Sequence, residues 1–543
     1  MGQLRSTGMS PYSFLGLALF MALVAVTYAH LPIPAADLPT QCNSIERCCM
    51  PTPYKGKPAY NFEYKKFKKF NVRRPAHLLT KKEITRLEKA YTLMRALPDS
   101  DPRSLLNQMK LHCLYCDNAL YYPGQQYPLE VHNGWFFLPW HRMFMYWHER
   151  ILQKLLKDDT FTLPFWAWDN SMDVKPVPNE MPAPYARKGS SLYDEARNNC
   201  SFPPFLVDLD TAGGGCTTKT PDFIRIQNDR LQYTQLVVGA TTPSLFFGLP
   251  YYFGDYGGKG SGTFEDQPHG TVHAWLGRQD APILGPQYHP YDDMGNFGRA
   301  AFDPIFYPHH TNVDRIWCLW THIPGGKRTH PTHPAFLNTQ FTFYDENANL
   351  VKHNVSQALD TDLLGYKFES YPTPWMTNGV QAGRENSIPL CNPLSKKATE
   401  SLISSTPKQR STQVLLADPI TFKVARPKKS KGTEVLEISG IHIPNKTAQA
   451  HWKVYLFYPN VSFLTGAACP EFAGTFNWIP HVGQVAYNPD RVWRMGVGPK
   501  LLQMGKDYVK SIVVTVVQTG FPLQALTFDS AKIIYDNSPE VEL

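Results

Sequence analysis

The first two thirds of the chain alternate between apolar patterns of helical period and stretches rich in proline. From Trp140 to Leu156, apolar residues recur at helical spacing without an interrupting Pro or Gly, which predicts a long helix. A second helical segment is predicted from Pro221 to Val238. Elsewhere between Lys157 and Asp266, closely spaced prolines predict loops rather than long regular elements. Together these patterns predict a mainly helical domain with loop-rich surroundings.

The C-terminal part of the chain has the period of strands. Its alternating or β-branched runs occur at Ile420–Val424, Glu434–Ile438, Trp452–Tyr458 and Ser511–Gln518. Short strands separated by turns predict an all-β sandwich of roughly 130 residues. Residues 392–412 are rich in Ser, Thr, Lys and Pro, which predicts an exposed, protease-accessible linker. The expected domains are therefore residues 30–391, mainly helical, and residues 413–543, all β.

The N-terminus has the pattern of a secretory signal peptide. Arg5 gives a short basic region, Phe14 to Val26 is apolar, and Thr27-Tyr28-Ala29 supplies small residues for a signal peptidase. We therefore expect residues 1–29 to be removed, which leaves a mature protein without a membrane segment. The alternative is that the apolar run anchors the chain in a membrane. Four glycosylation sequons, at Asn199, Asn354, Asn445 and Asn460, are compatible with the secretory pathway.

Composition and charge are those of a globular protein. The 543 residues are 43% hydrophobic and 18% charged, which is enough for two or three domains with a large core. The net charge of +8 is spread along the chain. Its densest run, Lys65-Lys66-Phe67-Lys68-Lys69, is interpreted as a solvated edge rather than a nucleic-acid surface. No nucleic-acid partner is expected.

Histidine spacing indicates two metal sites. His269 and His273 are four residues apart and project from one helix face, so both can hold the same ion. The pair His309-His310 lies downstream and can add a third imidazole from a second helix. A separate set upstream consists of His112, His132 and His141. Imidazole suits copper and leaves room for an external ligand, although composition alone does not exclude zinc.

The region around the upstream set also allows predictions of local structure. His132 and His141 flank Pro139, so we expect them at the two ends of a bent or broken helical segment. His148 is about two turns beyond His141, which is too far for the same metal. It is interpreted as a structural histidine.

Two long motifs carry a family resemblance. Residues His132 to Glu149 (HNGWFFLPWHRMFMYWHE) resemble the first copper signature of the tyrosinase and catechol oxidase family. Residues Asp303 to Asp314 (DPIFYPHHTNVD) resemble the second, and both motifs occur in the family's order. The plant polyphenol oxidases are the most similar members. The resemblance implies a four-helix bundle that holds two copper ions and uses O2 as co-substrate to oxidise small phenolic substrates.

The resemblance also implies the copper ligands. One ion is expected on His112, His132 and His141, and the other on His269, His273 and His310. His310 is preferred to His309 because it follows Phe297 by thirteen residues, which is the family's spacing. His309 is then expected to lie behind the ligands. Asp314, one turn after His310, is expected to accept a ring N–H and fix the tautomer.

Four further residues are expected near the copper pair. By resemblance, Glu265 orients a water that can accept a phenol proton, and Phe297 is the aromatic gate above the second copper. The alternative for Glu265 is a solvated surface position. Gly270 and Ala274 each follow a ligand of the second set, and their small side chains are expected to leave a wide mouth. Family members that hydroxylate monophenols strongly often have Asn in place of Gly270, so this glycine favours oxidation of o-diphenols.

Ten cysteines in an oxidising compartment are expected to be mostly paired. Cys200 and Cys216 flank a Gly-rich loop, and we infer a disulfide between them. The family pattern implies two more disulfides, Cys42–Cys49 and Cys48–Cys113, which would tie the N-terminal segment to the copper core. The partners of Cys318, Cys391 and Cys469 are left open.

Cys116 has a different expected role. By resemblance it forms a thioether with a ring carbon of His132, which would fix the orientation of that imidazole. The alternative is a buried free thiol.

The resemblance finally implies a latent enzyme. Trp452-Lys453-Val454-Tyr455 resembles a motif of the family's C-terminal domain, which covers the copper mouth until a processing protease acts on the linker. The expected reaction turns o-diphenols into o-quinones while O2 is reduced to water, and monophenols would need an added oxygen insertion. The chain lacks the long Ser-rich chloroplast transit peptide of most plant members. This favours a vacuolar or extracellular location over the thylakoid lumen.

Three alternatives stay open. A haemocyanin-like protein would use the same histidine sets to bind O2 reversibly, without forming quinone. A specialised phenol oxidase of plant secondary metabolism, such as an aurone-forming enzyme, would share the site but differ in substrate. A zinc hydrolase fits less well, because such sites usually include carboxylate ligands.

Overall fold

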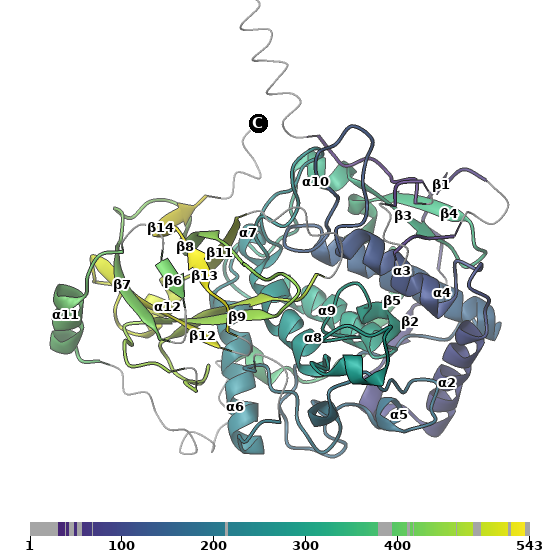
Figure 1. Cartoon of the computed structure of the whole chain (residues 1–543), viewed down its shortest axis with the longest axis horizontal. Coiled ribbons are helices and arrows are strands. Elements are labelled where there is room, and N and C mark those ends of the chain that lie inside the picture. The colour runs from purple at the N-terminus through teal and green to yellow at the C-terminus, as the bar shows by residue number, and fades with distance from the viewer. Residues whose placement is uncertain are drawn as a thin grey trace, which may run out of the picture.

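The computed structural model has a mainly helical domain beside a β domain, as predicted (Figure 1). It describes residues 31–537 except 39, 43–47, 52–56, 68, 212–215, 378–393, 410–412, 416–417, 463, 482–489 and 520–522. The expected signal peptide at residues 1–29 lies outside the described residues, as does Cys391. The helical domain occupies the right of Figure 1 and the β domain the left.

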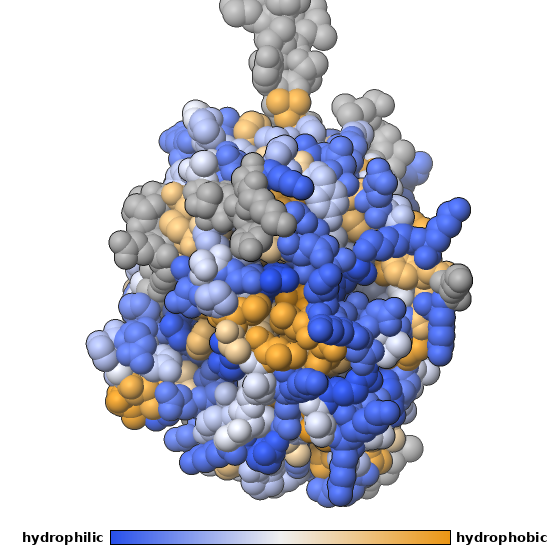
Figure 2. All heavy atoms as spheres, turned by 90° about the vertical axis from the view of Figure 1, so that its right-hand side faces the viewer, coloured by the Kyte–Doolittle hydropathy of each residue, from blue (hydrophilic) through white to orange (hydrophobic). Residues whose placement is uncertain are grey.

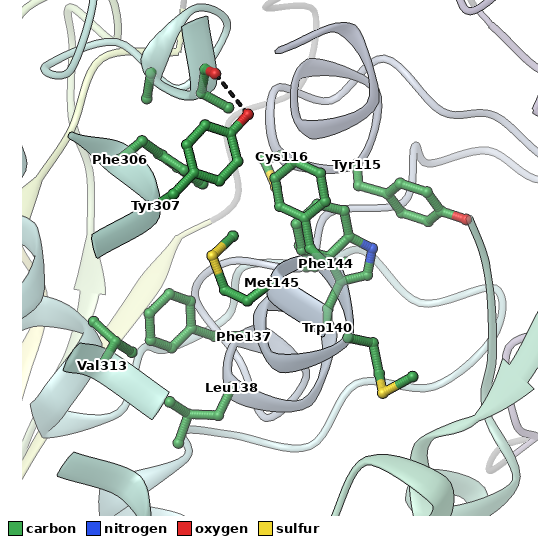
Figure 3. Packing of buried hydrophobic residues seen from close by; sticks show 14 of the residues in the cluster. Tyr115, Cys116, Phe137, Leu138, Trp140, Phe144, Met145, Phe306, Tyr307 and Val313 are labelled. Carbon is green, nitrogen blue, oxygen red and sulfur yellow. Dashed lines mark hydrogen bonds between the residues drawn. The ribbon is translucent and has the colours of Figure 1, made fainter. Parts of the chain in front are cut away.

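Four helices form the centre of the helical domain: α2 (Lys81–Arg95), α3 (Leu105–Cys116), α4 (Phe137–Leu156) and α9 (Phe306–Trp320). α4 packs against both α2 and α9, and α3 contacts α2. Aromatic side chains of α3, α4 and α9, among them Tyr115, Trp140 and Phe306, meet in one apolar core (Figure 3). α2 begins with a capping box, in which Thr80 and Glu83 each satisfy a backbone N–H group of the other.

The other helices of this domain are short. They are α5 (Ala183–Ala186), α6 (Pro221–Gln232), α7 (Pro243–Phe246), α8 (Gly270–Leu276) and α10 (Pro334–Asn338), the π-helical segments η4 (Tyr233–Val238) and η5 (Glu265–His269), and the 3-10 turns η2 (Ala76–Leu78), η3 (Asn199–Ser201), η6 (Ala281–Leu284), η7 (Ala300–Phe302), η8 (Val355–Ala358) and η9 (Pro374–Met376). α6 and η4 together confirm the helical segment predicted from residue 221 to residue 238. The loop-rich character predicted around it is confirmed as well.

Pro139 does not break the helix near the first histidine set. It is the third residue of α4, where its missing N–H group would have no partner within the helix. The long predicted helix is thus confirmed and starts slightly earlier. His132 lies in the loop before it, so the expected bent or broken segment that carries both histidines is wrong.

Two small sheets attach the N-terminal segment to the helical domain. One has the order β1 (Tyr60–Asn61), β4 (Leu350–Asn354), β3 (Gln340–Tyr344). In the other, β2 (Asn71–Arg73) pairs in parallel with β5 (Tyr366–Phe368).

The β domain consists of two antiparallel sheets that share a core. One sheet has the order β10 (Phe472–Trp478), β9 (Ala450–Leu456), β12 (Ser511–Thr519), β7 (Ile420–Ala425), and the other β11 (Arg491–Gly496), β8 (Thr433–Ile441), β14 (Ser530–Asp536). A short pair, β6 (Gln413–Leu415) with β13 (Leu526–Phe528), and helix α12 (Gly498–Gln503) complete it. Trp452 and Trp493 contribute to the core from opposite sheets. The four predicted strands correspond to β7, β8, β9 and β12.

The predicted linker is in part a docked helix. Residues 396–405 form α11 (Lys396–Ser405), whose Leu402 and Ile403 pack against the core of the β domain. Lys506 of that domain donates a 2.9 Å hydrogen bond to the buried Thr399 hydroxyl. The polar composition hid a narrow apolar face that the helix buries. This helix therefore packs against the β domain, while most of its residues are exposed as predicted.

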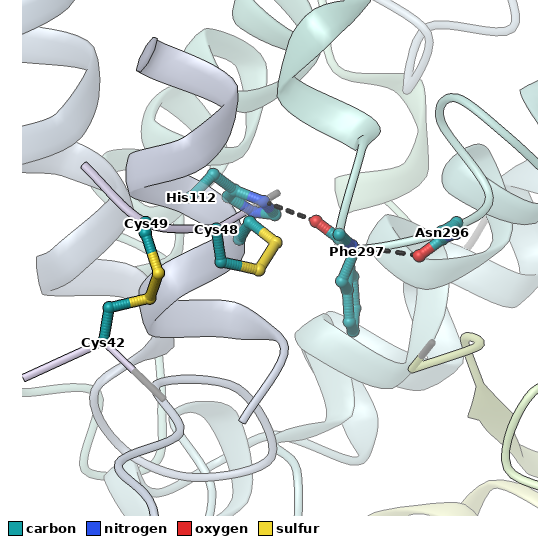
Figure 4. The surroundings of a disulfide bond; sticks show 8 residues. Cys42, Cys48, Cys49, His112, Asn296 and Phe297 are labelled. Atoms are coloured by element: carbon teal, nitrogen blue, oxygen red, sulfur yellow. Dashed lines mark hydrogen bonds between the residues drawn. A yellow bond between two sulfur atoms is a disulfide. The ribbon is translucent and has the colours of Figure 1, made fainter. Parts of the chain in front are cut away.

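The predicted disulfides Cys42–Cys49, Cys48–Cys113 and Cys200–Cys216 are confirmed. Cys48–Cys113 ties the N-terminal segment to α3 close to His112, and Cys42–Cys49 joins two residues within that segment (Figure 4). Cys469 is also disulfide-bonded. Cys116 and Cys318 are free thiols.

The surface agrees with the interpretation of the basic run. On the face of the helical domain turned away from the β domain, hydrophilic side chains surround an apolar patch (Figure 2). Lys65, Lys66 and Lys69 are exposed, and Lys65 pairs with Glu346 at 3.3 Å. Across the described part of the chain, the helices are all too short or too polar to cross a membrane.

Candidate active site

The first histidine set lies at the centre of the helical domain. His112 is on α3, His132 is in the loop before α4, and His141 is on α4. Their ring centroids are 5.0 to 5.8 Å apart. All three are at most 2% exposed, so they form a site closed off from bulk water.

The second set adjoins the first. His269 ends η5, His273 lies on α8 and His310 lies on α9, with ring centroids 4.7 to 5.4 Å apart. These rings are buried as well. His141 of the first set stacks on His310 at 4.3 Å, so two ions held by the two sets would be neighbours.

The hydrogen bonds of these rings orient their free nitrogens. His112, His141, His269 and His273 direct Nδ1 at backbone carbonyl oxygens 2.7 to 3.0 Å away. A carbonyl accepts only from N–H, so Nε2 of these rings carries the lone pair. The Nε2 atoms of His273 and His310 approach to 3.3 Å, and those of His112 and His141 to 3.5 Å.

The donor set fits copper. Burial lowers the pKa of each of these imidazoles, so the rings are neutral and available as ligands. The Nε2 atoms of His132 and His269 are buried without a hydrogen-bond partner, which an ion between the rings would supply. Neutral imidazoles without a carboxylate among them suit copper, as they also suit zinc.

Both members of the pair His309-His310 lie near the second set, with a ring nitrogen within 4.8 Å of those of His269 and His273. His310 alone also stacks on the first set. The His309 ring stacks on His269 instead, at 5.2 Å. The position between the two sets favours His310 as the ligand.

Asp314 does not touch the His310 ring, so its expected role is wrong. Its carboxylate accepts hydrogen bonds from Arg142 at 2.6 Å, from Arg73 at 3.0 Å and from the Tyr366 hydroxyl at 2.5 Å. Nδ1 of His310 is left without a partner among the described residues. The two buried arginines outcompete a neutral imidazole because charge-assisted hydrogen bonds are stronger. Asp314 therefore anchors α9 to α4 and β2.

Glu265 lies at the mouth of the site and is buried, so the surface alternative is wrong. Its Oε1 accepts the Asn133 backbone N–H at 2.6 Å, whereas Oε2 has no partner. The cavity beside it leaves about 10 Å³ for the centre of a water molecule, which is room for about one water. Burial raises the pKa of Glu265 well above its usual range. This geometry supports the expected role in holding a water.

Two domains form the walls of this cavity. The helical domain contributes Asn133, Ser261, Glu265, Asp266, His269, Gly270 and Phe297, and the β domain contributes Asn477, Trp478, Ile479 and His481. The end of β10 and the residues after it therefore cover the mouth.

Phe297 lies across both histidine sets rather than above the second alone. Its ring stacks on His132 at 3.9 Å, with 7° between the planes, and lies 5.8 Å from His273. Its carbonyl oxygen accepts from His112 Nδ1 at 2.9 Å, which ties its backbone to the first set (Figure 4). The Phe297 ring also makes an edge-to-face contact with the His481 ring of the β domain, with 5.0 Å between the centroids.

The two small residues expected at the mouth differ in position. A Cβ atom on Gly270 would come within 2.6 Å of the Asn477 Nδ2 atom, so in this closed chain Asn477 fills the space that the glycine leaves. Ala274 is buried and does not belong to the cavity wall. The expected wide mouth therefore depends on Gly270 alone.

Cys116 ends α3 and is buried beside the first set. Its sulfur lies within 4.8 Å of ring nitrogens of His112, His132 and His141. The structure holds it as a free thiol close enough to His132 to be compatible with the expected thioether, which stays a prediction. His148 is structural as predicted, since its ring nitrogens contact Gln108 and the Tyr91 hydroxyl.

Sequence reasoning missed the charged groups around the mouth. Glu130 accepts the His132 backbone N–H at 2.9 Å, and its other oxygen lies 3.6 Å from His481 Nε2. Asp266 adjoins Glu265 and accepts the backbone N–H of Asn477. Arg491 of β11 lies over the Trp478 ring at 4.1 Å. Neighbouring positions in sequence could have suggested the two acids, but no signal connected Arg491 to this site.

Protein-family models match along the chain. The common central domain of tyrosinase matches residues 102–323, the polyphenol oxidase middle domain residues 330–381, and the chloroplastic polyphenol oxidase C-terminal domain residues 410–535.

Individual proteins match over most of the chain. A chloroplastic polyphenol oxidase of Vitis vinifera is 38% identical over 460 residues, which are 82% of this chain and 72% of that protein. The aureusidin synthase of Antirrhinum majus is 36% identical, over 82% of this chain and 78% of its own. The structure of latent apple tyrosinase is 34% identical with a TM-score of 0.76, covering 88% of this chain and 100% of that one. Grenache (Vitis vinifera) polyphenol oxidase is 42% identical with a TM-score of 0.58, covering 63% and 99%.

Proposed function

The chain belongs to the tyrosinase family, among its plant polyphenol oxidases, and we propose that it is a latent o-diphenol oxidase whose two copper ions are held by six buried histidines. It is a copper-dependent oxidoreductase that acts on phenols. The observation that carries the proposal is the pair of adjoining histidine sets, in which His141 and His310 stack at 4.3 Å.

His112, His132 and His141 would hold one ion, and His269, His273 and His310 the other. Copper bound there would supply the electron transfer from o-diphenols to O2, with two diphenols converted to o-quinones for each O2 reduced to two water molecules. The chain contributes neutral imidazoles, and in four of them (His112, His141, His269 and His273) a carbonyl oxygen holds Nδ1, which fixes the tautomer and leaves Nε2 directed inward. Three imidazoles per ion leave a position open for an external ligand.

Glu265 is the proton acceptor that we propose. The Asn133 N–H fixes one carboxylate oxygen, and the other faces the cavity without a partner. A phenol hydroxyl there could pass its proton to this oxygen directly or through one water. Because burial raises the pKa of Glu265, its ionised form is a stronger base than an exposed carboxylate.

We expect o-diphenols to be preferred to monophenols. A side chain at position 270 could help Glu265 to hold a water, and glycine has none. In the closed chain the Asn477 amide lies at that place, but it belongs to the β domain and leaves when that domain opens. The aurone-forming alternative is supported by the likeness to the aureusidin synthase of Antirrhinum majus and differs from this proposal only in its substrate.

Latency is proposed to arise from the β domain. Asn477, Trp478, Ile479 and His481 leave room for about one water and not for a catechol. A buried ion pair, Lys453 Nζ to Asp210 Oδ2 at 2.7 Å, also crosses the interface between the domains. A covalently attached cover competes at an effective concentration of roughly millimolar, which a weakly bound phenol would not match.

The proposed location is the secretory pathway, with the mature enzyme in the vacuole or outside the cell. The apolar N-terminal run and its small residues support this proposal. The names of the Vitis vinifera and Malus domestica relatives place those proteins in the chloroplast. A fluorescent fusion that accumulates in chloroplasts would contradict the proposal.

Oxygen uptake by the purified chain, before and after limited proteolysis, tests the function. We expect about two copper ions per chain and little activity on 4-methylcatechol in the intact form. Cleavage between residues 392 and 413, at either end of α11, should raise the rate by an order of magnitude or more at constant copper content. Reversible O2 binding without quinone would instead favour an oxygen carrier. An intact chain, verified by mass spectrometry, that is as fast as the cleaved one would refute latency.

A further inference from the structure

Three carboxylates surround the mouth of the copper site. Glu265 and Asp266 line its cavity, and Glu130 lies behind His132. All three are at most 6% exposed. The cavity wall that the helical domain contributes contains no Lys or Arg among the described residues. The helical domain therefore presents an acidic mouth.

The cation that faces this mouth comes from the other domain. Arg491, the first residue of β11, is 6% exposed and donates a 2.7 Å hydrogen bond to the Gly258 carbonyl oxygen. Its charge interacts with those of Glu130, Asp266 and Glu265. His481 adds a ring nitrogen 3.6 Å from Glu130. In the closed chain, one guanidinium from the β domain thus acts on all three acidic groups of the helical domain.

When the β domain moves away from the mouth, Arg491 leaves with it. In the closed chain burial raises the pKa of Asp266 to about 8, and water that enters the open mouth favours the ionised carboxylate at neutral pH. The same opening breaks the hydrogen bond from the Asn477 N–H to Asp266. One side of the Asp266 carboxylate is then free to face an incoming substrate.

We propose that the opened enzyme selects catechols with a cationic side chain over catechols with a carboxylate, and that Asp266 sets this preference. The inference rests on the proposed function and adds the charge class of its substrate. Glu130 and Glu265 are less suited to the role, because backbone N–H groups of the helical domain already hold their carboxylates, that of His132 on Glu130 at 2.9 Å and that of Asn133 on Glu265 at 2.6 Å. From the helical domain Asp266 is held by a side chain, the Ser261 hydroxyl, and the charge of Arg491 acts on it while the chain is closed.

The size of the effect follows from Coulomb's law. A unit charge about 6 Å from Asp266, at an effective dielectric constant of about 50, changes binding by about fivefold to tenfold. The interaction with Asp266 is attractive for an ammonium and repulsive for a carboxylate. The ratio of kcat/KM for the two substrates therefore changes by the product of both effects. Salt should reduce that ratio because the open mouth is solvated.

The test uses the copper-loaded full chain, nicked by limited proteolysis, on three catechols with the same ring. These are dopamine, the neutral 4-methylcatechol and 3-(3,4-dihydroxyphenyl)propionate. We expect kcat/KM for dopamine to exceed that for the propionate by an order of magnitude or more. The value for the neutral 4-methylcatechol should lie between them. Asp266→Asn should lower this ratio at least fivefold. Asp159→Asn, which removes an exposed charge near the end of α4, should leave the ratio unchanged.

Failure of this inference can be distinguished from failure of the proposed function on which it rests. Equal kcat/KM values for dopamine and the propionate in the parent overturn the inference. So does a ratio of these two values that is the same in Asp266→Asn as in the parent. No oxidation of any catechol by the nicked parent would instead refute the proposed function. If Asp266→Asn does not retain copper, the inference is tested on the parent, through the salt dependence of the ratio of kcat/KM for dopamine to that for the propionate. A ratio that stays constant from about 20 mM to about 500 mM NaCl then overturns the inference.

Discussion

The ion pair between Lys453 and Asp210 offers the sharpest test of closure. Lys453 lies on β9 and Asp210 in the helical domain, with 2.7 Å between Nζ and Oδ2. Both side chains are at most 2% exposed. Lys453→Met keeps the apolar stem and removes the charge, so the substitution leaves Asp210 facing an apolar wall across the interface.

The magnitude follows from what remains around Asp210. Removing one partner of a buried pair costs about 3–5 kcal/mol, because the other charge is left uncompensated. Here Lys219 stays 3.5 Å from Asp210 and 2.9 Å from Asp208, so we expect a smaller loss of about 2 kcal/mol. The pair exists only when the domains are closed, and the whole loss therefore acts on closure. About 2 kcal/mol shifts the equilibrium towards the open form by about 30-fold.

The assay is catechol oxidation by the intact chain, with its mass and copper content checked. Lys453→Met should raise the rate by about 30-fold, up to the rate of the cleaved enzyme. Lys532→Met is the matched control, because Lys532 pairs with Glu437 inside the β domain at 2.9 Å. The double variant with Asp210→Asn should regain part of the latency, since it removes the stranded charge. If Lys453→Met stays as latent as the parent while its Tm falls, the reasoning is refuted.

Other substitutions test the ligands, the substrate preference and the cover. His310→Ala should lose the second copper by metal analysis, whereas His309→Ala should retain more, and full copper with full activity in His310→Ala would contradict the ligand assignment. Gly270→Asn, measured after cleavage because the new side chain would collide with Asn477 in the closed chain, should raise the rate on tyramine relative to dopamine. An unchanged ratio would speak against the role of that glycine. His481→Gln should weaken activation by mild acid, which is read from activity against pH. Burial lowers the pKa of His481 to about 3 in the closed chain, so only the open form takes up the proton as pH falls through about 6.5. Glu130 and Asp266, whose pKa burial raises to about 8, act in the opposite direction, and an identical acid response in the variant would exclude His481 as the cause.

Local periodicity was enough to predict the elements that carry the site. α4 and the strands β7, β8, β9 and β12 bury one face or both with a regular period, which the sequence displays directly. The i, i+4 spacing of His269 and His273 likewise placed both rings on one side of the chain. Family motifs supplied the pairing of the two sets, which no local pattern contains.

Predictions failed where a distant group competes with a local one. Asp314 is one turn from His310, but Arg73 and Arg142 reach it from β2 and α4. The positions of these two arginines depend on tertiary packing, which the spacing of residues along a helix does not reveal. α11 illustrates a second limit, because its few apolar residues became meaningful only once the β domain offered a core for Leu402 and Ile403.

Gly270 shows how one position can serve two properties that the sequence presents as unrelated. Read alone, the glycine is a missing side chain, which leaves Glu265 without help in holding a water for monophenols. The closed structure adds a steric reason, because a Cβ atom there would come within 2.6 Å of the Asn477 amide. A larger residue at this position would therefore displace the Asn477 amide in the closed chain, and we expect it to assist Glu265. If Gly270 sets the substrate preference as proposed, the residue at position 270 therefore acts on both properties, through Glu265 in the helical domain and through Asn477 in the β domain.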